Sequence, residues 1–256
     1  MSGETRRLVV RADDVGMCHA VNEGTRIGLE NGIVTQVSLM APCPWFPEAV
    51  EFVRHSAVPA GLHMTLTCEW DYLRWRPLTN GASLGQSDGT FYRTVEEAAT
   101  HLMYDEALTE LLAQAEQARS SGIPLSYLDV HMGAACQDAY GSVSVALGLP
   151  LLIPGYPSSF AFTSRSELSP RSAEAKKAWL LRYLEELGPG VHLLVCHLAV
   201  SGPEIASLTN ADSAPFRWAE EYRASDLQVV CDPDIRQAID AFGIELTSIQ
   251  ALLAGA

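Results

Sequence analysis

The chain has 256 residues, of which 48% are hydrophobic, so it can bury a full core and is too apolar to be disordered. A net charge of −14, with only 17 Lys and Arg, argues against nucleic acid or an anionic membrane as a partner, since both bind clustered cations. We find neither an apolar run of about 20 residues nor a signal peptide. The six cysteines are scattered and form no Cys-x-x-Cys pair. Together these features predict a cytoplasmic protein with reduced thiols.

Short apolar runs alternate with helical patterns along the chain. The first predicted strand covers residues 8–12, and further strands are predicted at 36–40, 61–66, 127–130, 150–153 and 191–196. Helices are predicted between them, at 19–31, 47–54, 95–121, a short stretch ending near 146, and 173–187, and a helix, a short strand at 244–246 and a helical turn follow residue 233. This order predicts an α/β fold with mostly parallel strands, closed as a barrel or doubly wound. Because no linker interrupts it, we expect a single domain over residues 1–256.

Polar side chains that can bind a metal lie at the ends of the predicted strands. In chain order they are Asp13, Asp14, His63, Asp129, His131 and His197. The carboxyl ends of parallel strands open on one face of the sheet, so these side chains can converge. One carboxylate with two neutral imidazoles is a common catalytic site for zinc and for iron. The pattern therefore favours a metal centre.

Each candidate also has a structural explanation when it is taken alone. Asp13 or Asp14 would serve as the N-cap of the next helix, and a single histidine is more often a core residue. Asp129 could orient a ligand histidine or cap a turn. His19 opens the first helix close to the aspartates, which leaves a peripheral role open. The convergence of four strand ends is what favours metal binding over these explanations.

Six motifs resemble, in this order, the YdjC-like (ChbG/HpnK) carbohydrate deacetylases: VVRADDVGM…VNEG, GIVTQVSLMAP, AGLHMTLT, RPLT, GIPLSYLDVHMG and VCHLA. The resemblance implies a distorted (β/α) barrel, TIM-barrel-like, in which one divalent metal ion, with zinc and magnesium as the first candidates, supports removal of an N-acetyl group from an amino sugar. It implies that Asp14, His63 and His131 are the metal ligands, that Asp13 is the general base and that His197 is the general acid.

The chain departs from the family pattern at two places. The family usually has further histidines just after the position of His131, where this chain has Gly133 and Ala135, and Pro-Gly after the last histidine, where it has Leu198 and Ala199. The predicted metal ligands are intact, so these departures bear on the contacts with substrate.

Two long segments lack periodicity, residues 67–92 and 201–215, and loops of this length are usually lids or binding elements. Of the aromatic and arginine side chains in the first segment, we take Trp70, Tyr72 and Arg76 as candidates for binding the sugar. Local packing or contact within a homodimer is the alternative explanation. Two other functions stay open: a carbohydrate-binding protein that has lost catalysis, and an iron oxygenase with two histidines and one carboxylate.

Overall fold

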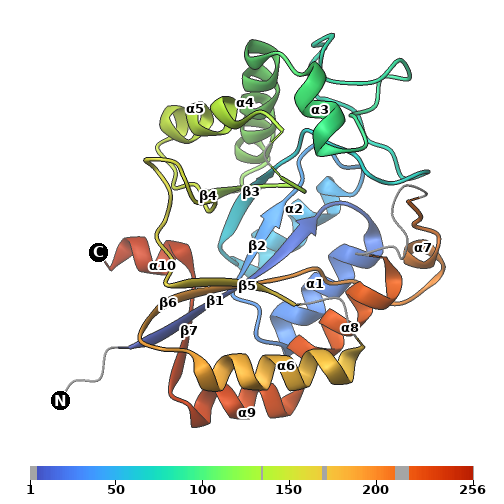
Figure 1. Ribbon diagram of the computed structural model, residues 1–256. Coiled ribbons are helices and arrows are strands. Elements are labelled where there is room, and N and C mark those ends of the chain that lie inside the picture. Colours follow the sequence, from blue (N-terminus) through green and yellow to red (C-terminus); the bar gives the residue numbers. More distant parts are fainter. Residues whose placement is uncertain (1–4, 134, 169–171, 211–218, 256) are drawn as a thin grey trace.

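The computed structural model describes residues 5–133, 135–168, 172–210 and 219–255. Within them, parallel strands form one sheet in the order β4-β3-β2-β1-β6-β5, and β7 pairs with the first half of β1. The strands are β1 Arg6–Val15, β2 Gln36–Leu39, β3 Ala60–Met64, β4 Leu125–Val130, β5 Ser164–Glu167, β6 Gly190–Cys196 and β7 Ile244–Thr247. The sheet forms a distorted, TIM-barrel-like α/β barrel, as predicted (Figure 1).

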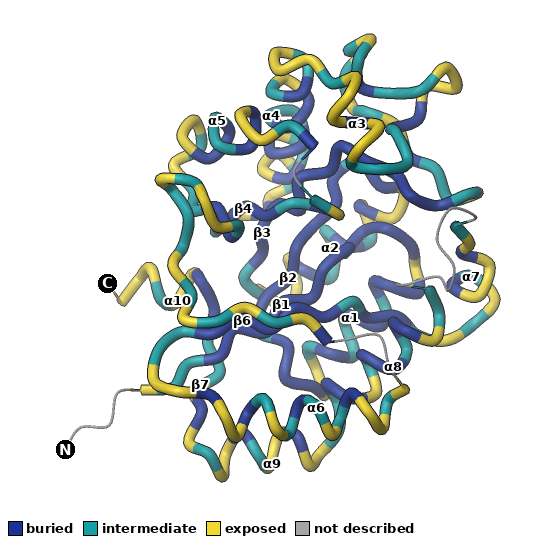
Figure 2. The backbone as a smooth tube through the Cα atoms, viewed as in Figure 1, coloured by how far each residue is buried: buried dark blue, intermediate teal, exposed yellow. Residues whose placement is uncertain are grey.

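Helices lie around the strands, of which β1, β2, β3, β4 and β6 are mostly buried, whereas β5 and β7 are partly exposed (Figures 1 and 2). The helices are α1 His19–Asn31, α2 Phe46–Ser56, α3 Val95–His101, α4 Tyr104–Ser120, α5 Gln137–Leu147, α6 Ala173–Glu186, α7 Pro203–Ala206, α8 Glu220–Val230, α9 Pro233–Ala241 and α10 Ile249–Ala254. Among the described residues, no helix combines the length and the apolar character needed to cross a bilayer.

The inside of the barrel is filled at the end where the strands begin. An apolar cluster there contains Val9, Tyr127, Leu152, Leu193, Val195 and Ile249. Gly61 leaves room for the Tyr127 ring, because a Cβ at that glycine would lie 2.1 Å from the ring. The first residue of α10, Ile249, closes this end, and its backbone N–H donates to the Gln36 side chain at 3.0 Å. Among the described residues, apolar side chains thus pack inside the barrel, and the polar cavity lies at the carboxyl ends of the strands.

Two predicted elements differ from the structure. The helix predicted over 95–121 is two helices, α3 and α4, because the chain is extended at Leu102 and the Ser83 hydroxyl accepts the backbone N–H of Met103. The strand predicted over 150–153 is reduced to isolated bridges at Leu151, since prolines at both ends of this run remove backbone donors.

Three elements of the structure were not predicted, and one of them is the short helix α7 within the predicted loop 201–215. Strand β5 has the sequence SRSE, which has no apolar residue to mark it as a strand. Helix α8 buries polar side chains, including Arg223 and Asp226, so its apolar periodicity is weak. Part of the predicted loop 201–215 lies outside the described residues.

Candidate metal centre and cavity

An irregularity in β1 places the two carboxylates that end the strand. The register with β2 shifts between Ala12 and Val15, and Asp14 has a left-handed backbone with a φ of 64°. Non-glycine residues rarely adopt this conformation, and it is concentrated at functional sites. In a regular strand Asp13 and Asp14 would point to opposite faces, but the bulge lets both line one cavity.

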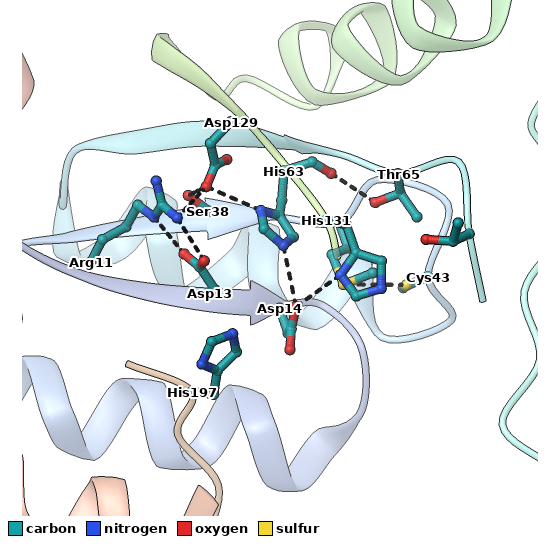
Figure 3. A network of polar contacts seen from close by, with 12 residues as sticks. Arg11, Asp13, Asp14, Ser38, Cys43, His63, Thr65, Asp129, His131 and His197 are labelled. Carbon is teal, nitrogen blue, oxygen red and sulfur yellow. Dashed lines mark hydrogen bonds and ion pairs between the residues drawn. The ribbon is translucent and has the colours of Figure 1, made fainter. Parts of the chain in front are cut away.

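Asp14, His63 and His131 converge as predicted, although they come from three segments of the chain (Figure 3). Asp14 Oδ1 lies 3.3 Å from His63 Nε2 and 3.2 Å from His131 Nδ1. Each of the three buried residues offers a ligand atom, and these atoms lie within 4.8 Å of one another. The second carboxylate oxygen of Asp14 accepts a hydrogen bond at 2.7 Å from Arg223, a residue of α8 that sequence reasoning missed.

The donor atoms fit a divalent metal. Asp14 Oδ1 is buried and has no hydrogen-bond partner among the described residues, although it faces two imidazoles. Burial alone would raise the pKa of Asp14, but the charge of Arg223 and the two imidazoles that face the carboxylate hold that pKa well below its ordinary value. The carboxylate is therefore ionised. One carboxylate and two imidazole nitrogens match the donor set of zinc and related ions.

A second group of close donors, Asp13, His63 and Asp129, is already neutralised by an arginine. Arg11 donates to both carboxylate oxygens of Asp13, at 2.5 and 2.7 Å, and its Nη2 lies 2.8 Å from Asp129 Oδ2. Burial opposes the charged form, but the carboxylates of Asp129 and Asp13 raise the pKa of Arg11. This guanidinium occupies the place of a cation, so the Asp14 group is the candidate metal site.

Each histidine of the group has a second carboxylate on its other ring nitrogen. His63 Nδ1 lies 3.1 Å from Asp129 Oδ2, and these two residues are register partners of β3 and β4. His131 Nε2 lies 3.0 Å from Glu69 Oε2. The sequence predicted Asp129 as a partner of a ligand. It gave no signal for Glu69, which lies in the long loop without any strand or helix pattern.

The carboxylates also change the protonation of the two rings. Burial alone would lower the pKa of His63, but the charges of Asp129 and Asp13 raise it to about 10. Burial is likewise outweighed at His131, where Glu69 and Asp14 raise the pKa to about 9. Both imidazoles therefore hold a proton at neutral pH when no metal is bound, and a metal ion has to displace these protons.

His197 follows β6 and lies beside the two aspartates (Figure 3). Its backbone N–H donates to Asp226 Oδ2 at 2.9 Å, and Asp226 is in turn held by a buried Lys176 at 2.5 Å. Its ring Nδ1 lies 3.6 Å from Glu167. Burial lowers the pKa of His197, although the charges of Asp14 and Asp13 act in the opposite direction.

A cavity of about 700 Å³ opens over these groups. Its lining includes five predicted residues: Asp13, Asp14, His63, His131 and His197. It also includes residues that were not predicted, such as Arg11, Glu69, Met132, Tyr156, Arg165 and Arg223. The cavity thus combines a polar floor with an apolar side.

The three residues proposed for sugar contacts lie elsewhere. Trp70 is fully buried, with the Arg223 guanidinium 5.8 Å above its ring. Tyr72 is 86% exposed, and Arg76 lies against Gly89. None of the three is among the described residues that line the cavity. His19 bonds to Glu48 at the surface and is also outside this lining.

The departures from the family pattern have different surroundings. Gly133 lines the cavity, and a Cβ there would meet only the Val95 side chain, at 3.5 Å, so the glycine keeps this side of the cavity open. Leu198 and Ala199 are buried and pack against glycines of α1. The second departure therefore belongs to the packing of the barrel rather than to the described cavity wall.

Comparisons with known proteins show which chains this protein is similar to. A family model described as YdjC-like protein matches residues 7–241. A carbohydrate deacetylase of Thermus thermophilus is 28% identical, with 94% of this chain and 92% of the relative covered. A chitooligosaccharide deacetylase of Yersinia enterocolitica is 26% identical, with 94% and 97% covered. The crystal structure of an Enterococcus faecalis protein, proposed to cleave cellobiose phosphate, has the same fold, with a TM-score of 0.79, 21% identity and coverage of 97% and 99%.

Proposed function

This chain belongs to the YdjC-like protein family, and on that premise we propose that it is a metal-dependent hydrolase that removes the N-acetyl group from an amino sugar or a short oligosaccharide. Relatives that align over nearly the whole chain are carbohydrate deacetylases. The observation that carries the proposal is the convergence of Asp14, His63 and His131 in a cavity that also contains Asp13 and His197.

Amide hydrolysis needs a polarised carbonyl and an activated water. A divalent ion held by Asp14, His63 and His131 would polarise the acetyl carbonyl and lower the pKa of a water by several units. Asp13 is not part of that donor group, and both of its oxygens are anchored by Arg11, which holds its carboxylate at the cavity floor. Asp13 then takes the proton from the attacking water as the general base.

The departing amine needs a proton, and we assign its supply to His197, which lines the same cavity. In its protonated form His197 is a stronger acid than an exposed histidine, because burial lowers its pKa. Asp226 accepts the backbone N–H of His197 and fixes the start of the segment that carries the ring. The substrate sugar would occupy the cavity, whose lining includes Met132 and Tyr156.

The direct test is acetate release. Chelator-treated protein is incubated with N-acetylated mono- and oligosaccharides, with and without Zn²⁺, Mg²⁺, Mn²⁺ or Co²⁺, and free acetate and free amine are measured. We expect equal amounts of both products, only with added metal. Sugar binding without acetate release under every metal would support the carbohydrate-binding alternative. Oxygen consumption with Fe²⁺ would support the oxygenase.

A further inference from the structure

We propose that Glu69 is a positioning residue that fixes His131 in the form needed to bind the metal, and that the long loop 67–92 delivers it. This inference rests on the proposed function, because it concerns the metal site. Glu69 Oε2 lies 3.0 Å from His131 Nε2, and the two side chains are only 7% and 4% exposed. Among the described residues, no other group bonds the Glu69 carboxylate.

The two histidines face Asp14 through opposite ring nitrogens. His63 turns Nε2 toward Asp14 Oδ1, and its Nδ1 faces Asp129. His131 turns Nδ1 toward the same oxygen, and its Nε2 faces Glu69. A neutral imidazole carries its proton on one nitrogen and a lone pair on the other. A carboxylate on Nε2 therefore keeps the proton there and leaves the Nδ1 lone pair for a metal ion.

The two carboxylates that face the histidines, Asp129 and Glu69, lie in a strand and in a loop. Asp129 is a residue of β4 next to His63 on β3, so the sheet itself sets their distance. Glu69 lies outside every strand and helix, and only the folding of its loop can bring it to His131. The loop therefore has to be rigid at this position if Glu69 is to orient the ring.

The segment around Glu69 is held on both sides. The Arg74 guanidinium donates to the backbone carbonyls of Cys68, at 2.5 Å, and Trp70, at 3.1 Å. The Trp75 indole N–H donates to the carbonyl of Thr67 at 2.9 Å. These bonds fix the backbone directly before and after Glu69.

The aromatic side chains of the loop serve the same purpose. Trp70 and Trp75 are buried, and the Trp75 ring meets the His131 ring edge-on with centroids 5.9 Å apart. Packing on the His131 ring limits its rotation, and Glu69 then fixes its tautomer. The loop 67–92, which was predicted to bind the sugar, thus holds His131 of the proposed metal site in place.

The test compares metal affinity in four proteins: the wild type, Glu69→Leu, Glu69→Gln and Asp71→Asn. Affinity for Zn²⁺ is measured by competition with a chromophoric chelator. We expect Glu69→Leu to lose about 10- to 100-fold in affinity, as for other partners of metal-binding histidines. Glu69→Gln should recover most of the loss, because an amide oxygen still accepts a hydrogen bond from Nε2. Asp71→Asn perturbs an ion pair of the same loop, with Arg93, and should bind like the wild type.

A second readout follows the ring itself. Nitrogen-15 NMR of histidine, recorded at alkaline pH without metal, reports which nitrogen of His131 carries the proton. We expect the Nε2–H form in the wild type and in Glu69→Gln, and a mixture of both forms in Glu69→Leu. The proposal is overturned if Glu69→Leu keeps wild-type affinity and tautomer, or if Asp71→Asn loses as much affinity as Glu69→Leu. A wild type that binds no metal would defeat the proposed function, and the spectra would still decide the role of Glu69.

Discussion

Two neighbouring carboxylates at the end of one strand would repel each other unless each has its own counter-charge. In the structure, Asp13 accepts a hydrogen bond from Arg11 and Asp14 accepts one from Arg223. A bulge in β1 turns the two side chains into different parts of one cavity. The pair therefore has the separate environments that a base and a metal ligand need.

The two aspartates can be separated by isosteric substitutions. Asn tolerates the left-handed backbone at position 14, so Asp14→Asn should fold, and we expect it to lose bound metal, because the charged ligand oxygen is removed. Asp13→Asn should keep its metal and lose about 10²- to 10⁴-fold in the rate of acetate release, the range for a general base. Elemental analysis and acetate release are measured on both variants. Full metal content in Asp14→Asn would contradict the assignment.

At the scale of elements, the position of His197 depends on packing between α1 and the segment after β6. A Cβ at Gly24 of α1 would lie 2.6 Å from the Ala199 backbone, closer than real contacts allow. The glycine is therefore required by the close approach of a helix to a backbone, two residues after His197.

Gly24→Ala should destabilise the protein by about 1–3 kcal/mol, because backbone has to move to admit the methyl group. Gly188→Ala is the matched control, since a Cβ at Gly188 meets no atom within 4 Å. The free energy of unfolding is measured by urea denaturation. Equal stability of the two variants would show that this contact is looser than the structure indicates.

The sequence predicted the elements that follow strong apolar patterns and missed those that are polar. Residues 19–31 were predicted as a helix and are α1, and the strand ends that carry Asp14, His63 and His131 follow from the alternation of strands and helices. Arg223 on α8 and Glu69 in its loop were missed, because each is placed by tertiary contacts rather than by a local pattern.

At the scale of the whole molecule, parallel strands bring distant residues to one rim. The end of the barrel where the strands begin is filled by apolar side chains, and the charged groups lie at the other end. The protein thereby buries two histidines among carboxylates. We therefore expect the stability of the fold to depend on pH and on added metal.

The metal-free protein should lose stability as the pH rises above neutral. In the folded state the pKa of His63 is about 10 and that of His131 about 9, above the ordinary 6.5. A pKa that is higher in the folded state than in the unfolded state stabilises the fold, and this stabilisation is complete below pH 6.5. It is lost as the pH rises through 9 to 10. For His131 the lost stabilisation is on the order of 3 kcal/mol. Thermal unfolding of chelator-treated protein across this range measures the effect.

The stabilisation by added metal should depend on pH in the opposite direction. Because the metal competes with protons for the two rings, its stabilising effect should grow as the pH rises. His131→Asn is the control and should show a weaker dependence on both pH and metal. A metal-free wild type whose pH dependence matches that of His131→Asn would contradict the protonation described for this ring.

The central claim is that one divalent ion binds between Asp14, His63 and His131, and anomalous diffraction tests it most directly. Crystals grown with Zn²⁺ or Mn²⁺ are measured at the absorption edge of the metal. We predict one strong anomalous peak in the cavity, within coordination distance of Asp14 Oδ1, His63 Nε2 and His131 Nδ1. A peak between Asp13 and Asp129 instead, or a cavity without a peak at saturating metal, would contradict it.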